Sequence, residues 1–253
     1  MSIQSIDRAC DIIELLSHTP RGMILSDMAH ALSLPVSTVY RISADLVKKG
    51  YVDKSKDMNI YKIGLNFIDL SSLFLTNLEL KTEAHPYLME LSRQVGFPVF
   101  LATMLDHEVC YIDRIAPLDA DKAYSIVGQK RSLFTTALGK ALIMDFSDED
   151  VSALIKERGI TRYTPYSITD PEDFKEELKK CRERGWSTDN QEDRLDFQCV
   201  GVPVYDFRKN IVASISTSWG KKHFSRMDIP SVALLVQSAA QKISERLGSH
   251  FNS

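Results

Sequence analysis

The sequence predicts an α+β protein made of two domains that a helix connects. Three observations predict it. Three short helical patterns and two alternating segments open the chain, two further pairs of strand-like segments come after residue 80, and helical patterns separate those pairs. Helices packed on an antiparallel sheet are typical of the α+β class. The expected domains are residues 1–64 and 80–253, with a linker helix over residues 65–79.

The first domain is expected to contain three helices and a β-hairpin, because apolar residues recur at spacings of three and four before the pattern changes to alternation. The expected elements are helices over residues 3–16, 26–32 and 35–50, then strands over residues 51–54 and 60–63. Ser26 is expected to be the N-cap of the second helix. A turn longer than two residues joins the two strands.

The second domain is expected to alternate between helices and strands. The expected helices cover residues 85–95, 136–145, 148–158, 171–184 and 228–247, and the expected strands cover residues 98–105, 109–115, 123–127, 200–205 and 211–218. The linker over residues 65–79 carries apolar residues on more than one face. We therefore expect it to pack against its own domain and against a partner chain.

Residues 25–41 have the pattern of a helix-turn-helix, which needs a small residue where its helices approach and apolar residues between them. Ala29 is the small residue, and Ser33 stands in the turn where glycine is usual. The residues expected to face inward are Met28, Leu32, Leu34, Val39 and Ile42. The residues expected to face outward, with groups suited to phosphates and base edges, are Val36, Ser37, Thr38, Tyr40 and Arg41.

The hairpin behind this motif makes it a winged helix, and the local charge favours DNA binding. Lys54 and Lys56 lie at the hairpin turn, where they either reach the DNA or remain as solvated surface charges. Residues 36–64 contain six basic and three acidic residues, whereas the whole chain of 253 residues has a net charge of −3. That net charge excludes a histone-like protein that coats nucleic acid by bulk positive charge.

Two stretches of the second domain have residues suited to a small acid. Thr136, Ala137 and Leu138 open a helix, where free backbone N–H groups can bind a carboxylate, although an ordinary capped helix has the same pattern. Asp189 lies by the end of a strand. It can accept hydrogen bonds from the hydroxyls of a ligand, or it can belong to a solvated loop.

A third stretch places hydroxyl groups along one strand. Alternation puts Ser214, Ser216 and Ser218 on one face, which we expect to lie opposite the helices. If that face is buried, the hydroxyls need polar partners, which a ligand would supply. If it is exposed, water supplies them.

Catalytic and metal sites have no support in the sequence. Cys199 has no motif-linked histidine base, and neither a GxSxG motif nor a pair of carboxylates stands out, so we expect Cys199 to line a pocket as a small apolar residue. The four cysteines and six histidines lack metal-ligand spacing. We expect no metal, no cofactor and no disulfide. No apolar run has the ~18 residues of a membrane helix, which favours a cytoplasmic protein without membrane contact.

Four stretches together resemble the IclR family of bacterial transcriptional regulators: SIQSIDRACDIIELL, LPVSTVYRISADLVKKGYV, GQKRSLFTTALGKALI and DNQEDRLDFQCVGVPVYDFRKNIVASISTS. The resemblance spans nearly the whole chain and is closest to the sugar-acid branch that includes 2-keto-3-deoxygluconate repressors. It implies an N-terminal winged helix-turn-helix, a linker helix, a C-terminal GAF-like effector-binding domain, and homodimers or tetramers. It also implies effector contacts at Ala137, Leu138, Asp189, Cys199, Ser216 and Ser218.

The motifs and the resemblance predict a DNA-binding transcriptional regulator. We expect it to repress a catabolic operon until a small organic acid, such as a sugar or keto acid, binds the second domain. A dimer would read a pseudo-palindromic operator in double-stranded DNA. A transcriptional activator remains an alternative, since the sequence does not determine the sign of regulation. An enzyme that acts on small acids is a less favoured alternative.

Overall fold

The computed structural model describes residues 3–55, 59–70, 79–117 and 127–249. The chain divides into two compact units, residues 1–77 and 78–253, and each has its own hydrophobic core. The combination of helices and antiparallel sheets confirms the predicted α+β class. Within the described residues, no helix is long and apolar enough to cross a membrane.

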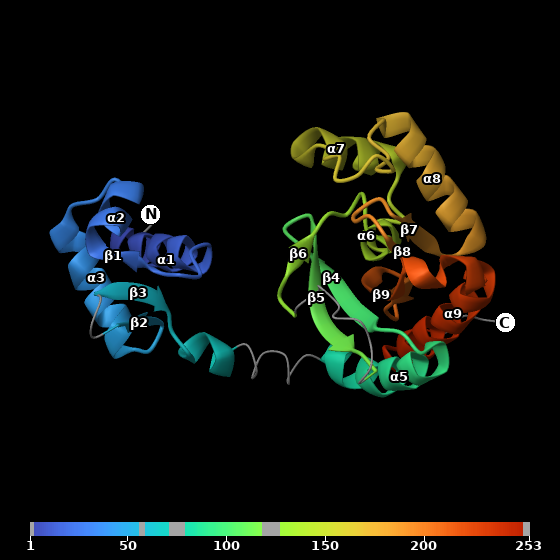
Figure 1. Ribbon diagram of the computed structural model, residues 1–253, viewed down its shortest axis with the longest axis horizontal. Coiled ribbons are helices and arrows are strands. Elements are labelled where there is room, and N and C mark those ends of the chain that lie inside the picture. The colour runs from blue at the N-terminus through green and yellow to red at the C-terminus, as the bar shows by residue number, and fades with distance from the viewer. Residues whose placement is uncertain (1–2, 56–58, 71–78, 118–126, 250–253) are drawn as a thin grey trace. The chain divides into compact units, whose positions relative to one another are not determined.

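The N-terminal unit contains three helices and a three-stranded antiparallel sheet (Figure 1). Its elements are α1 (Gln4–Ser17), β1 (Met23–Ile24), α2 (Leu25–Ala31), α3 (Val36–Lys48), β2 (Val52–Lys54) and β3 (Ile60–Ile63). The strand β3 lies between β1 and β2. This is the predicted winged helix-turn-helix, with one additional short strand, β1, that extends the wing.

The interface between α2 and α3 is closed by the residues that the sequence predicts to face inward. Met28, Ala29 and Val39 are at most 4% exposed, and the other three predicted residues pack against them partly buried. Ser33 adopts a left-handed backbone conformation, with φ of 52°, in the turn between the helices. This conformation explains why glycine is the usual residue there.

The beginning of α2 differs from the prediction. The helix begins at Leu25, and the N-cap position belongs to Ile24, whose side chain makes no capping hydrogen bond. Ser26 is therefore inside the first turn, where its hydroxyl contacts the carboxylate of Asp27 at 3.3 Å. The strand β1 pairs directly with β3. This pairing fixes the chain just before α2 begins, a role that a hydroxyl cap would otherwise have.

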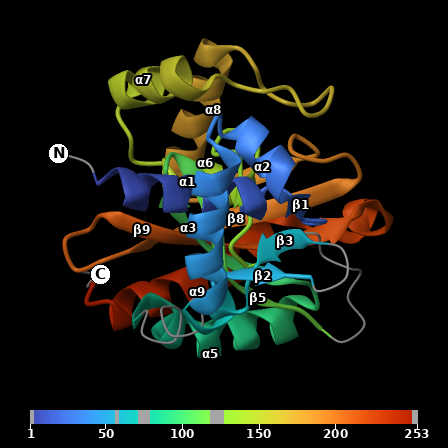
Figure 2. The ribbon, with the colours of Figure 1, turned by 90° about the vertical axis from the view of Figure 1, so that its left-hand side faces the viewer.

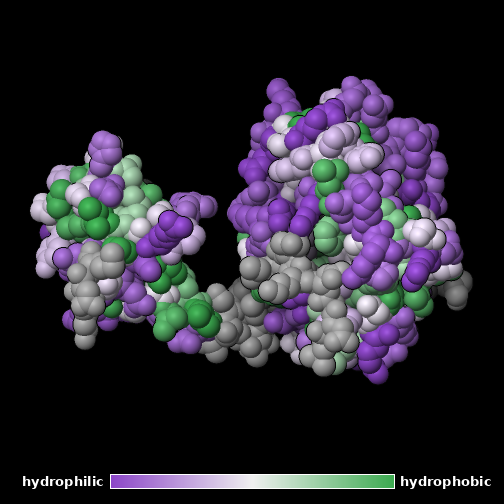
Figure 3. Space-filling model, in the orientation of Figure 1, coloured by the Kyte–Doolittle hydropathy of each residue, from purple (hydrophilic) through white to green (hydrophobic). Residues whose placement is uncertain are grey.

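Residues 66–70 are helical, which agrees with the start of the predicted linker helix. The predicted helix continues over residues 71–78, which lie outside the described residues. Leu65, Ile68 and Leu70 are between 46% and 70% exposed. They are exposed apolar side chains of the N-terminal unit, on whose surface Figure 3 shows hydrophobic areas.

The C-terminal unit is built on a six-stranded antiparallel sheet with the order β6-β5-β4-β9-β8-β7. The strands are β4 (Val99–Leu105), β5 (Glu108–Ile115), β6 (Lys130–Arg131), β7 (Ser187–Asn190), β8 (Phe197–Tyr205) and β9 (Ile211–Gly220). The predicted strand over residues 123–127 falls almost wholly outside the described residues, and Val127 itself lies in a turn.

Helices cover both faces of this sheet (Figure 1). The helices α5 (Glu79–Val95) and α9 (Ile229–Arg246) lie on one face, and α6 (Ala137–Leu142), α7 (Asp148–Arg158) and α8 (Pro171–Arg184) lie on the other. The short 3-10 helix η1 (Lys221–Arg226) follows β9. The sheet curls around α6, so this short helix sits inside the concave face.

Two glycines allow α6 to pack closely against its surroundings: Gly201 against the sheet, and Gly139 against the turn that precedes the helix. A Cβ atom on Gly201 of β8 would lie 2.5 Å from the carbonyl oxygen of Ala137, and one on Gly139 would lie 2.4 Å from the Cα atom of Leu133. Ser187 and Ser214 donate hydrogen bonds to the carbonyls of Ala137 and Leu138, at 2.6 and 3.0 Å. The serine-bearing face of β9 therefore packs against a helix, which corrects the prediction that it lies opposite the helices.

Candidate functional site

The outward face of α3 carries the side chains that the sequence predicts for DNA contacts. Val36 and Tyr40 are 51% and 55% exposed, Ser37 and Arg41 are also exposed, and Thr38 is half-buried. Figure 2 shows α3 crossing the front of its unit with the wing strands beside it. Val36, Ser37, Tyr40 and Arg41 therefore lie on one accessible helix face adjacent to the wing, and Thr38 lies at its margin.

The wing contributes Lys54, which is exposed at the end of β2. Its Nζ atom lies 5.4 Å from the centre of the Tyr61 ring in the neighbouring strand β3. Because Tyr61 is buried, this contact holds the lysine stem along the wing. Lys56, the second predicted wing residue, lies outside the described residues.

A cavity of about 80 Å³ opens between α6 and the concave face of the sheet in the C-terminal unit. Its walls include every residue predicted to contact an effector: Thr136, Ala137, Leu138, Asp189, Cys199, Ser216 and Ser218. It also includes residues that sequence reasoning did not select: Phe100, Tyr111, Arg131, Asp193, Arg194 and Phe197. The cavity thus combines aromatic walls with hydroxyls, carboxylates and two guanidinium groups.

Strand pairing explains how residues far apart in the sequence meet in this cavity. Asp189 of β7 pairs with Cys199 of β8, and Cys199 pairs with Ser218 of β9. Directly paired residues on adjacent strands direct their side chains to the same face. Ser216 pairs with Gly201 in the neighbouring row. The three strands consequently present a continuous polar surface to the cavity.

The start of α6 forms one wall of the cavity. Thr136 is the N-cap residue: its hydroxyl accepts a hydrogen bond from the backbone N–H of Gly139 at 3.0 Å and donates one to the carbonyl of Ser132 at 2.8 Å. The first N–H groups of a helix have no acceptor inside the helix. Once Thr136 has bound Gly139, the N–H groups of Ala137 and Leu138 are the ones left to bind a ligand.

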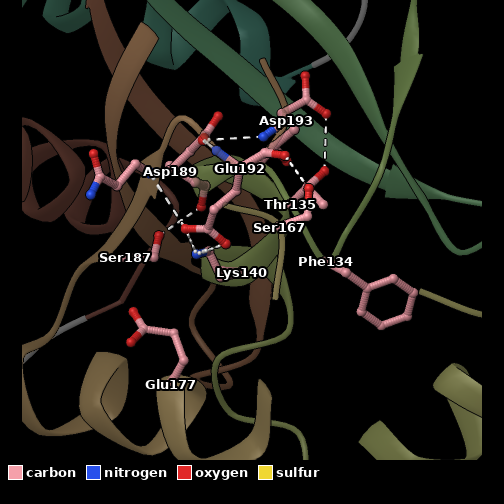
Figure 4. Close-up of polar contacts among 12 residues, drawn as sticks. Phe134, Thr135, Lys140, Ser167, Glu177, Ser187, Asp189, Glu192 and Asp193 are labelled. Atoms are coloured by element: carbon pink, nitrogen blue, oxygen red, sulfur yellow. Dashed lines mark hydrogen bonds and ion pairs between the residues drawn. The ribbon is translucent and has the colours of Figure 1, made fainter. Parts of the chain in front are cut away.

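A buried ion pair lies behind the polar wall (Figure 4). The ammonium group of Lys140, which is 0% exposed, donates to both carboxylate oxygens of Glu192, at 2.7 and 2.9 Å. Asp189 Oδ1 accepts hydrogen bonds from the backbone N–H groups of Glu192 and Asp193, at 2.7 and 3.3 Å. Together these contacts fix the turn after β7 against α6.

Burial changes the acidity of two cavity residues. It raises the pKa of Asp189 to about 7, although the ammonium of Lys140 opposes the shift. It also raises the pKa of the Cys199 thiol well above its ordinary value. Cys199 Sγ lies 3.8 Å from Asp189 Oδ2. A thiol that stays protonated is a poor nucleophile. Cys199 therefore lines the cavity and is not suited to act as a nucleophile.

The turn after β7 is also held from its outer side. Ser167 donates a hydrogen bond to the carbonyl of Glu192 at 2.6 Å, and Thr164 donates one to the carbonyl of Gln191, also at 2.6 Å. Thr135 donates to Asp193 Oδ1 at 3.0 Å (Figure 4). These contacts, which no sequence motif indicated, place Asp193 at the mouth of the cavity.

The described residues contain no group of three His, Cys, Asp or Glu side chains arranged to hold a metal ion. The polar groups of the cavity are hydrogen-bond donors, acceptors and guanidinium groups. This set of groups can bind an organic anion that carries hydroxyls.

Comparison with known proteins finds full-length relatives. The chain is 26% identical to the HTH-type transcriptional regulator XynR of Escherichia coli, over 97% of this chain and 98% of that protein. It is 27% identical to the HTH-type transcriptional regulator KdgR of the same species, over 98% and 94%. An IclR homologue from Microbacterium hydrocarbonoxydans, solved in complex with 4-hydroxybenzoate, shares the fold at a TM-score of 0.82 and 18% identity, over 96% and 98% of the two chains.

Both units also match family descriptions. Residues 5–56 match the IclR helix-turn-helix domain, and residues 72–245 match the C-terminal domain of the bacterial transcriptional regulator IclR. These matches agree with the winged helix-turn-helix and with the helix-covered sheet described above. The chain belongs to the IclR family of bacterial transcriptional regulators.

Proposed function

We propose that this protein, a DNA-binding transcriptional regulator of the IclR family, represses a catabolic operon in the cytoplasm and leaves its operator when a small organic acid binds. Membership of the family also confirms the prediction that the protein is not an enzyme. The observation that carries this proposal is the cavity beside α6, which combines buried hydrogen-bonding groups with Arg131 and Arg194 in the same chain as an exposed recognition helix.

The operator contacts are proposed to come from α3 and the wing. Arg41 and the hydroxyls of Ser37 and Thr38 are suited to base edges and phosphates, and Val36 and Tyr40 provide apolar contacts in the major groove. Lys54, together with Lys56, would bind the phosphate backbone. Exposed apolar residues on the segment 65–70 support a homodimer or a tetramer. A two-fold assembly would read a pseudo-palindromic operator in double-stranded DNA.

The effector is proposed to be a sugar or keto acid. Its carboxylate would accept hydrogen bonds from the N–H groups of Ala137 and Leu138, while Asp189, Ser216 and Ser218 would bind hydroxyl or keto groups. Thr136 would contribute to effector binding indirectly, by capping α6, and Cys199 would line the binding site as an apolar residue. The relative solved with 4-hydroxybenzoate supports an acid as the effector. Binding changes operator affinity only to the extent that the acid prefers one arrangement of the protein.

The test is an anisotropy titration against the DNA upstream of the gene for this protein, at a stated salt concentration, with and without sugar and keto acids. Release of the protein from DNA by one of these acids supports the proposal. Tighter binding in the presence of an acid contradicts repression and supports an activator. The variant Asp189→Ala should keep operator binding in the absence of acid and lose the response. A normal response in this variant would place the effector elsewhere.

A further inference from the structure

Arg131 occupies an unusual position for a charged residue of this sheet. It lies on β6, which is one edge of the sheet, whereas Asp189 lies on β7, the opposite edge. Both side chains nevertheless line the same cavity, because the sheet curls around α6 (Figure 1). Side chains from both edge strands therefore contribute to the wall of this cavity.

The neighbours of Arg131 are already paired with carboxylates. Lys130 binds Asp106 at 2.9 Å and lies 3.7 Å from Glu108, and Arg158 binds Glu108 at 3.2 Å. Among the described residues, no carboxylate lies within ion-pairing distance of Arg131. Since Arg131 is half-buried, its guanidinium is an anion-binding group without a counter-charge from those residues.

The cavity contains a second guanidinium group that favours an anion as well. Arg194 also lines it, with its guanidinium 4.8 Å from the centre of the Phe197 ring. Asp193 lines it too, but its carboxylate is engaged by the hydroxyl of Thr135. Arg131 and Asp193 line both this cavity and a polar groove on the outer surface. They therefore stand at the boundary between the cavity and solvent, where an acid would enter.

The walls of the same cavity also include the residues at the start of α6, Ala137 and Leu138, and the hydroxyls of Ser216 and Ser218. We propose that the effector is a dicarboxylic sugar acid, with one carboxylate at the start of α6 and the other on the guanidinium of Arg131. This inference rests on the proposed effector site and narrows its ligand class. Arg131 then selects diacids over monoacids, because a monoacid of equal length leaves the guanidinium without a partner.

The test compares acids of equal chain length by calorimetric titration of the full chain. The probes are L-threonate against L-tartrate, and D-gluconate against D-glucarate. Each pair differs in the oxidation of the terminal carbon to a second carboxylate. In at least one pair the diacid should bind about 10-fold to 100-fold more tightly, the range for a charge-assisted hydrogen-bond pair.

The variant Arg131→Gln should bind the monoacid as the unchanged protein does and should lose the preference for the diacid. Retained monoacid binding also shows that the variant is folded. The matched control is Lys130→Gln on the same strand. Lys130 lines the outer groove but not the cavity, so the preference should persist.

Two results would overturn the inference alone: equal affinity for monoacid and diacid in both pairs, or an equal loss of affinity for both in Arg131→Gln. In the second case Arg131 holds the carboxylate that the two acids share. If neither kind of acid binds the unchanged protein, the proposed effector site fails together with the inference.

Discussion

The DNA-binding face of α3 and the cavity of the C-terminal unit use polar side chains in opposite ways. On α3 the polar groups point to solvent, and the core behind them consists of apolar residues such as Val39. At the cavity, Asp189 in the wall and Lys140 behind it are themselves buried and help to hold the wall together. Substitutions on α3 should therefore change function alone, whereas substitutions around the cavity should also change stability.

The largest effect is expected from Lys140→Met. This variant removes the partner of a buried carboxylate, and breaking a buried ion pair in this way costs about 3–5 kcal/mol. The free energy of unfolding of the C-terminal unit, measured by urea denaturation, should fall by that amount. The control is Lys175→Met, which removes the i,i+3 pair of Lys175 with the exposed Glu172 and should cost about 0.5 kcal/mol or less. Equal losses in the two variants would contradict the comparison.

The second effect is a dependence of stability on pH through Asp189. Burial raises its pKa from 3.8 to about 7, so the folded state holds this proton more tightly than the unfolded state between those values. The free energy of unfolding should fall as pH rises from about 4 to about 7, by a few kcal/mol.

Asp189→Asn should reduce that fall, because the amide oxygen can still accept from the N–H groups of Glu192 and Asp193 but the side chain no longer ionises. Denaturation of both proteins at pH 5 and pH 8 provides the measurement. Burial also raises the pKa of Glu192. In Asp189→Asn the free energy of unfolding should therefore still fall as pH rises, but with a smaller slope. An unchanged slope in the variant would show that Asp189 does not ionise in this range.

On the exposed side of the comparison, Arg41→Ala should weaken specific operator binding by about 1–3 kcal/mol. The same variant should unfold at an unchanged urea concentration, since Arg41 is exposed. Anisotropy titrations against operator and unrelated DNA measure the first quantity, and urea denaturation measures the second. Retained operator affinity would remove Arg41 from the DNA contact surface.

The smallest effect is expected at the wing. Lys54→Ala should weaken binding to operator and unrelated DNA alike and should reduce the slope of log K against log salt by about 1. Titrations at several salt concentrations provide that slope. A loss confined to the operator would mean that Lys54 reads bases rather than phosphates.

The sequence predicted α7 and α8 well and the shortest strands poorly, and for α5 (Glu79–Val95) it missed the part before residue 85. The ranges of α7 and α8 follow from apolar spacing together with their start and stop residues, such as Gly185 at the end of α8. The strands β1 and β6 contain two residues each, which is too few to show an alternating pattern. Arg131 was missed for this reason, since its position became meaningful only when β6 paired with β5.

The cavity residues were predicted to different degrees for a similar reason. Asp189, Cys199, Ser216 and Ser218 lie in stretches that resemble the IclR family, and strand pairing brings them together. The contacts of Lys140 with Glu192 depend on how a helix and a turn pack 52 residues apart. No local pattern encodes such a contact, so the buried ion pair could not be predicted.

Glu192 uses three of its groups at once: the carboxylate binds Lys140, the N–H binds Asp189, and the carbonyl accepts from Ser167. These bonds specify the number of residues between positions 189 and 192, because an inserted residue would break at least one of them. A biosensor for a new acid should therefore be engineered by exchanging side chains such as Phe100, Tyr111 and Phe197 while the chain length of this turn is preserved.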